Sequence, residues 1–202
     1  MFGIEAKSFG AHVCDYASVF GGYAFKSKEF LNEGVPIIRI SDIDGETVSV
    51  DKAVCYPQSF WENNQSYRVI FNDVLMAMSG ATIGKIGMVT LDIPLLLNQR
   101  VACIRAKQPE YAYFLATILK MPWMQDIINN SSPGSAQPNI SGKQIEQLPI
   151  PAATDRQIKQ LSRLAAQSDK SKLKLQNPLA ELSAIKYTHK RNDRRRSYYG
   201  NF

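Results

Sequence analysis

Residues 134–151 are GSAQPNISGKQIEQLPIP, and the chain changes character across this stretch. Gly134, Pro138 and Gly142 form turns, and the residues between them carry amides and hydroxyls that can contact polar partners at a loop surface. Residues 148–151 have the pattern of a short, proline-bounded strand, and a helical pattern rich in Lys and Arg follows. We therefore expect a globular domain over residues 1–152 and a helical region over residues 153–190.

Charge is divided unevenly along the 202 residues. Residues 1–150 carry 12 Lys/Arg against 14 Asp/Glu, a net charge of −2, whereas residues 151–202 carry 12 against 4, a net charge of +8. From Lys186 onward the chain combines cations with Tyr and Phe, a composition that can hold phosphates and stack on bases. A flexible, solubilising tail has the same composition, and we expect residues 191–202 to be flexible.

Composition favours a soluble protein of the cytoplasm. An apolar run of roughly 20 residues, which a membrane helix needs, is absent, and the first residues lack the pattern of a secretory signal. The three cysteines, Cys14, Cys55 and Cys103, are far apart and outside any CxxC pair, which favours reduced, structural thiols.

Strand patterns separated by glycine turns dominate the first 106 residues. Residues 35–43 have the β-branched composition of a buried strand, and residues 46–51 are its expected hairpin partner. Residues 74–78 and 88–91 predict two further strands around a glycine-rich loop, SGATIGKIG at 79–87. Residues 95–106, LLLNQRVACIRA, predict one strand whose apolar run is interrupted at residues 98–100.

Helical periodicity begins at residue 109. Pro109 suits the first position of a helix over residues 109–119, and Pro122 ends or restarts that helix. Thr154 to Gln157 has the form of a capping box and predicts the start of the helical arm. The fold class expected is α+β, a strand-rich domain followed by a C-terminal helical arm. One heptad stripe of the arm consists of Ile158, Leu161, Ala165, Leu175, Leu179 and Leu182. Ser168, Lys172 and Lys186 interrupt this stripe, so we expect either two stacked helices or one kinked arm.

The sequence offers little catalytic chemistry. GATIGK at residues 80–85 is one residue too short for a phosphate-binding P-loop and lacks its Ser/Thr after the lysine. His12 and His189 are the two histidines, and neither has a second ligand at metal-binding spacing. Asp42 and Asp44 lie at a turn, where acids usually cap the backbone. We therefore expect no catalytic residue and no metal site.

Five segments together resemble one family, the specificity subunits of type I restriction–modification systems. They are GGYAFKSKEF (21–30), VPIIRISDI (35–43), SGATIGKIG (79–87), LNQRVACIRA (97–106) and residues 134–151 quoted above, and they occur in the order typical of the family. The resemblance implies that residues 1–152 form a target-recognition domain and that residues 153–190 mediate dimerisation and methyltransferase docking.

The resemblance also implies a function and its partners. A specificity subunit is not an enzyme: it binds double-stranded DNA and directs an adenine methyltransferase, and with it a restriction subunit, to a defined site. No cofactor is expected on this chain, because S-adenosylmethionine would be bound by the methyltransferase. The chain has one recognition unit where most members have two, so we expect either a homodimer or half of a longer subunit.

Candidate DNA-binding residues are polar side chains within the family segments. Amides pair with adenine and guanidinium groups with guanine, whereas lysines and hydroxyls suit phosphates. Polar residues of these segments also suit turns and caps, above all Asn98, Asn139 and Ser141, and residues 141–144 have the form of a capping box. Base contacts within residues 56–67 are an alternative. An alternative function is an interaction or inhibitory module that docks the methyltransferase without reading DNA. The candidates are Lys26, Ser27, Lys28, Ser79, Thr82, Lys85, Gln99, Arg100, Gln137, Asn139 and Lys143.

Overall fold

The computed structural model describes residues 9–131, 138–165 and 167. The chain divides into two compact units, Met1–Lys159 and Gln160–Phe202, and the labelled strands, helices and turns below lie in the first. The domain boundary expected after residue 152 stays a prediction. The predictions for Gln137, Leu175, Leu179, Leu182 and the basic tail concern residues outside the described ranges.

A four-stranded antiparallel sheet forms the centre of the first unit. Its order is β2 (Ala17–Gly21), β9 (Val101–Ala106), β6 (Val74–Ala77) and β7 (Ile86–Met88). Every residue of β6 is buried, so both faces of this sheet are covered. Because successive side chains point to opposite faces of a strand, Leu75 belongs to a different layer of the core from its neighbours in β6.

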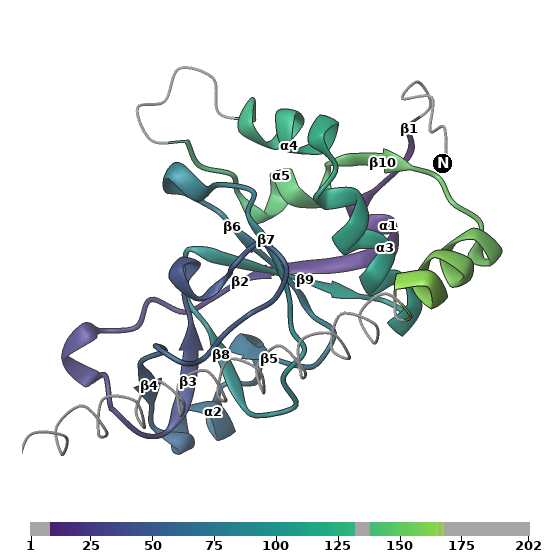
Figure 1. The fold of residues 1–202 in the computed structure, drawn as a ribbon. Helices are drawn as coiled ribbons and strands as arrows, with labels where there is room; N and C mark the ends of the chain where they lie inside the picture. Colours follow the sequence, from purple (N-terminus) through teal and green to yellow (C-terminus); the bar gives the residue numbers. More distant parts are fainter. Residues whose placement is uncertain (1–8, 132–137, 166, 168–202) are drawn as a thin grey trace, which may run out of the picture. The chain divides into compact units, whose positions relative to one another are not determined.

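Helices cover one face of this sheet (Figure 1). α3 (Pro109–Leu119) packs against β9, β6 and β7, and α5 (Gly142–Glu146) packs against β2. The remaining elements of this layer are α1 (Val13–Tyr16), α4 (Pro122–Asn129) and the strand pair β1 (Phe9–His12) and β10 (Pro149–Pro151).

A second four-stranded sheet has the order β4 (Cys55–Tyr56), β3 (Val35–Ile38), β8 (Leu95–Leu97) and β5 (Arg68–Val69). β3 and β8 are parallel, although almost 60 residues separate them in the sequence. The shorter helical elements are α2 (Gln58–Asn63) and the 3-10 turns η1 (Ser27–Glu29), η2 (Ile40–Asp42), η3 (Gln65–Tyr67) and η4 (Gly80–Thr82).

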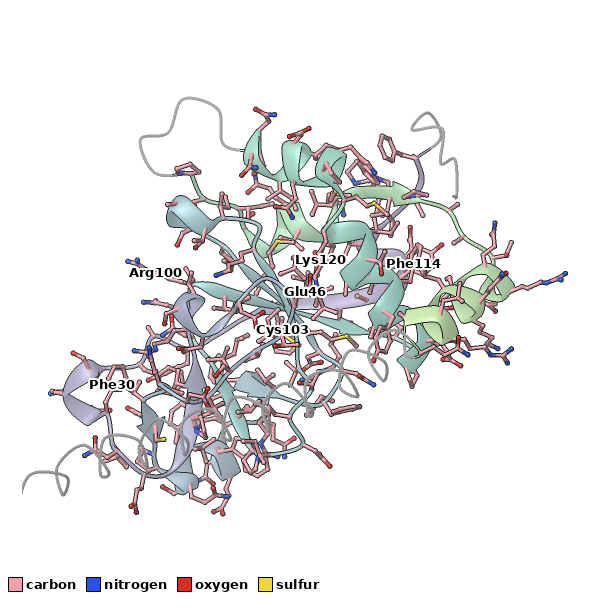
Figure 2. The ribbon with its side chains drawn as sticks, viewed as in Figure 1. Phe30, Glu46, Arg100, Cys103, Phe114 and Lys120 are labelled. Carbon is pink, nitrogen blue, oxygen red and sulfur yellow. The ribbon has the colours of Figure 1, made fainter. Side chains whose placement is uncertain are left out.

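Two apolar clusters hold the second sheet. Leu95 and Leu97 point into a cluster that also contains Leu75 and Cys103 of the first sheet. Leu96 points to the opposite face, into a cluster bordered by aromatic side chains of α2 and of the segment before η1. Cys103, labelled in Figure 2, is fully buried, and burial raises the pKa of its thiol well above the ordinary range. All three cysteines are free thiols, as predicted.

The structure confirms the α+β class and most of the local signals. Pro109 and Pro122 each occupy the first turn of a helix, and the Gln157 N–H donates to the Thr154 hydroxyl (3.4 Å) at the start of a helix over residues 155–165. Asp42 and Asp44 accept hydrogen bonds from nearby backbone N–H groups, including that of Arg39 at 2.9 Å. These carboxylates are therefore caps.

Two strand predictions are wrong, and a third is displaced: the strand expected over residues 88–91 is β7 at Ile86–Met88, so it begins inside the glycine-rich segment. Residues 95–106 form two strands in different sheets, β8 and β9, because residues 98–100 turn the chain: the Val101 N–H donates to the Asn98 carbonyl (2.9 Å). Residues 35–43 do not form a hairpin with residues 46–51. β3 ends at Ile38, η2 follows, and a single bridge between Ile43 and Val48 is all that remains of the expected pairing.

Main-chain hydrogen bonds join four segments to one another in series, and we call these segments the loop belt: residues 22–25, 98–100, 78–85 and 138–143. The Tyr23 N–H donates to the Leu97 carbonyl (2.8 Å), and the Gln99 N–H donates to the Tyr23 carbonyl (3.0 Å). The Met78 N–H donates to the Arg100 carbonyl (2.9 Å), and the Met78 carbonyl accepts from the Ile140 N–H (2.9 Å). Four segments distant in sequence therefore lie side by side.

Gly22 permits the closest approach within the loop belt. A Cβ atom at this position would lie 2.1 Å from the Leu97 carbonyl oxygen and 2.4 Å from the Asn98 carbonyl carbon. Both are backbone atoms, which cannot turn aside as the end of a side chain can. The neighbouring Gly21 has nothing within 4 Å of the corresponding position. A Cβ atom therefore fits at residue 21 but not at residue 22.

Buried charge ties β9 to the loop before β6. Arg105 donates to both carboxylate oxygens of Asp73, at 2.9 and 2.7 Å, and to the Arg68 carbonyl at 2.8 Å. Asp73 also accepts the Ile70 N–H (2.8 Å), and its side chain is 2% exposed. A second ion pair, Lys120 with Glu46 (3.0 Å), lies at the surface, where the Glu46 side chain is 71% exposed (Figure 2).

Gly22→Ala is expected to lower the free energy of unfolding by about 1–3 kcal/mol, because the added methyl group must displace the backbone of residues 97–98. Gly21→Ala is the matched control and is expected to leave stability nearly unchanged. Chemical denaturation of the two variants measures the difference. Equal stability of both would contradict the close approach that we describe.

Asp73→Ala is expected to lower the free energy of unfolding by about 3 kcal/mol, because it leaves Arg105 without its buried partner. Lys120→Ala, which breaks the exposed ion pair, is expected to cost less than about 1 kcal/mol. Thermal and chemical denaturation of both variants test this order. A loss for Lys120→Ala that matches or exceeds the loss for Asp73→Ala would overturn it.

Candidate nucleic-acid interface

The loop belt carries positive charge without negative charge. Its four segments contain three cationic residues, Lys85, Arg100 and Lys143, and no Asp or Glu. Arg100 and Lys143 are exposed and Lys85 is half-buried. Within the part of the chain that the structure describes, none of the three forms an ion pair. These cations are therefore available to an anionic ligand.

The predicted residues Gln99 and Arg100 lie at the corner between the two sheets. Both side chains are exposed. Their backbone N–H groups donate hydrogen bonds, that of Gln99 to the Tyr23 carbonyl and that of Arg100 to the Asn98 side-chain oxygen at 3.2 Å. Figure 2 shows Arg100 extending away from the body of the ribbon. The backbone thus fixes this corner and leaves the two side chains to solvent.

Ser79, Thr82 and Lys85 belong to the glycine-rich loop between β6 and β7. The loop closes on itself through the Gly84 N–H, which donates to the Ala77 carbonyl (2.9 Å). From outside, the Gln125 side chain of α4 donates to the Gly84 carbonyl at 3.0 Å. Thr82 is exposed and Ser79 half-buried. The loop is therefore held at its base while its tip faces solvent.

Asn139 and Lys143 lie beside that loop. Ser79 and Asn139 form an antiparallel bridge, and the Gly80 N–H donates to the Pro138 carbonyl (3.2 Å). Ser141 caps α5, because its hydroxyl accepts the Gln144 N–H at 3.2 Å. Lys143 and Asn139 are exposed. The structure thus brings the predicted segments 79–87 and 138–143 together, and the expected capping role of Ser141 is confirmed.

Lys26, Ser27 and Lys28 are exposed on η1, which follows the Tyr23 segment of the loop belt. Lys26 lies 3.8 Å from Glu29, whereas Lys28 forms no ion pair with any described residue. Glu29 accepts a hydrogen bond from the buried Tyr56 hydroxyl. That hydrogen bond, then burial and the Glu29 charge, raise the pKa of Tyr56 to about 12, so the hydroxyl stays a donor at neutral pH.

An aromatic cluster beside the loop belt was missed in the sequence. The Tyr23 ring lies 5.0 Å from the Phe60 ring and 5.2 Å from the Tyr67 ring, and Phe25 lies 4.9 Å from Tyr56. These contacts join residues 22–25 to residues 56–67. The sequence signal is the aromatic content of both segments, but nothing in either segment alone indicates that they meet.

The heptad stripe of the arm is described only at its start. Ile158 is 1% exposed in the single chain, so it is covered by the chain itself, whereas Leu161 and Ala165 are half-buried. Among the described residues, no group of three His, Cys, Asp or Glu side chains is placed to hold a metal ion. None of their helices is long and apolar enough to cross a membrane.

Solved structures of similar fold are specificity subunits. The S subunit of a type I restriction–modification system from M. genitalium aligns with 88% of this chain and 43% of its own, at a TM-score of 0.60 and 15% identity. The HsdS subunit from Thermoanaerobacter tengcongensis aligns with 83% of this chain and 38% of its own, at a TM-score of 0.52 and 13% identity. At such low identity these likenesses concern the fold alone.

Relatives in sequence are also specificity subunits. The EcoBI specificity subunit of Escherichia coli is 30% identical over 171 residues, which are 79% of this chain and 33% of the relative. The EcoAI specificity subunit of Escherichia coli is 28% identical over 187 residues, 83% of this chain and 31% of the relative. The chain thus spans about a third of these relatives. The family model described as the type I restriction modification DNA specificity domain matches residues 12–177, and the chain belongs to that family.

Proposed function

We propose that the chain is the DNA-reading part of a type I specificity subunit, which binds duplex DNA through the loop belt and η1. The observation that supports this most is that main-chain hydrogen bonds bring together four distant segments that contain cations and no carboxylates. Unpaired cations and turn residues in such segments suit phosphate contacts, which position a protein on DNA. Lys28, Lys85, Arg100 and Lys143 are the cations concerned.

Under this proposed function the chain acts with protein partners and catalyses no reaction itself. In it, the chain directs an adenine methyltransferase, and through the full assembly a restriction subunit, to the DNA site. The chain itself needs no cofactor, since the methyltransferase would bind S-adenosylmethionine. A second recognition unit, from a second copy of this chain or from another part of a longer subunit, would complete the two-part target.

The proposal predicts DNA binding that weakens steeply with salt. Single changes of Lys28, Lys85, Arg100 or Lys143 to Ala are each expected to reduce the slope of log K against log salt by about 1, because each removes one phosphate contact. Lys120→Ala, whose ammonium is paired with Glu46, is the control and is expected to leave the slope unchanged. Fluorescence anisotropy with a duplex at several salt concentrations provides the measurement.

Slopes that stay at the unsubstituted value in all four variants would exclude the loop belt as the DNA surface. The alternative, a module that docks the methyltransferase without reading DNA, predicts that result together with intact co-purification of the methyltransferase. Selection from random duplexes by the full chain with a type I methyltransferase subunit tests reading directly. A defined motif is expected, and its absence would contradict sequence-specific binding.

A further inference from the structure

The helix α2 and the turn η3 present one polar face, and this inference about that face builds on the proposed function. Between residues 58 and 66 every exposed side chain is polar, and the less exposed ones include Phe60 and Trp61. Within α2 the exposed positions 58, 59, 62 and 63 follow helical spacing and lie on one side of the helix. The exposed positions 65 and 66 of η3 follow after Asn64, whose backbone is not helical. We call these six positions together the polar face. They are Gln58, Ser59, Glu62, Asn63, Gln65 and Ser66.

The opposite face of α2 is anchored by aromatic side chains. The Phe60 ring lies 5.0 Å from the Tyr56 ring, 5.0 Å from the Tyr23 ring and 5.4 Å from the Phe25 ring. A helix of six residues is not stable alone, so these contacts hold it in place. The anchoring fixes where the polar face of α2 points.

Arg68 fixes the carboxyl end of the same helix. Its guanidinium donates to the Trp61 carbonyl at 2.7 Å and to the Glu62 carbonyl at 2.6 Å, and it lies 4.0 Å from the centre of the Trp61 ring. These bonds satisfy helix carbonyls that would otherwise lack partners. Arg68, which lies outside the helix, therefore holds the carboxyl end of α2 through two backbone carbonyls.

α2 adjoins both parts of the proposed phosphate-binding surface. Tyr56, directly before the helix, donates to Glu29 of η1, the turn that carries Lys28. Tyr23, which packs on Phe60, exchanges backbone hydrogen bonds with Leu97 and Gln99 of the sheet corner. A polar face next to cationic loops has the arrangement that groove reading requires, with base contacts flanked by phosphate contacts.

We propose that the polar face of α2 and η3 contacts base edges and determines the target sequence, with Gln65 and Glu62 as the principal specificity residues. The Gln65 amide has no hydrogen-bond partner among the residues that the structure describes, and a free amide can pair with adenine. One Glu62 oxygen accepts from Gln58 at 3.3 Å, which leaves the other for a cytosine amino group. The remaining amide, of Asn63, is used within the helix, where it donates to the Ser59 carbonyl (2.8 Å).

The test compares target selection by Gln65→Ala, Glu62→Ala and the double variant in the full chain, each with the type I methyltransferase subunit. Asn129→Ala, which removes an exposed amide at the end of α4, is the control. Each α2 variant is expected to lose selection at particular positions of the motif and to bind the original site about tenfold to one-hundredfold more weakly. The salt slope and the thermal midpoint are expected to stay unchanged, because no cation and no packed side chain is removed.

The outcomes separate this inference from the proposed function. A double variant that selects the original motif, with affinity within threefold of the unsubstituted chain, overturns the assignment of α2 alone. An unsubstituted complex that selects no motif overturns sequence-specific binding, and with it this inference. Loss of selection by Asn129→Ala to the same extent as by the α2 variants also overturns it, because the effect would not be specific to α2.

Discussion

The backbone turn at residues 98–100 connects the two sheets and the loop belt. It sends β8 into one sheet and β9 into the other, and Leu97 before it and Val101 after it both enter the cluster between the sheets. The same turn bonds to Tyr23 on one side and to Met78 on the other. Because these bonds use main-chain atoms, most residues of the loop belt are not required for them by their side chains. Gly22 is the exception, because a Cβ atom at this position would collide with the backbone of residues 97 and 98.

Local chemistry could be predicted from the sequence wherever one short segment decides the outcome. The prolines at residues 109 and 122 and the capping boxes at Ser141 and Thr154 needed only neighbouring residues, and the structure confirms all four. Pairing between distant strands could not be predicted from neighbouring residues. β3 pairs with β8 and not with the adjacent segment, and Leu96 of β8 is thereby buried in the cluster that aromatic side chains border.

For the candidate site too, individual residues could be predicted from the sequence, but the contacts between distant segments could not. The family segments gave the polar residues of the loop belt, and the structure shows that those segments meet, which no single segment indicates. From the sequence, residues 56–67 are only an alternative location for base contacts. Their arrangement as an anchored helix depends on Tyr23 and Arg68, which lie outside the helix, so no pattern within residues 58–63 could reveal it.

Anchoring a polar helix by backbone and aromatic contacts has a consequence for how such a reader changes its target. The exposed residues of α2 contribute little to stability, since Phe60 and Arg68 hold the helix from behind and from its end. Surface substitutions away from packed features usually alter stability by less than about 0.5 kcal/mol. Under the proposed function, the phosphate contacts of the loop belt would keep the DNA in register while Glu62 and Gln65 are replaced. The target sequence could therefore change without a change of fold. A surface whose residues both bound phosphates and recognised bases would lose DNA binding when those residues were replaced.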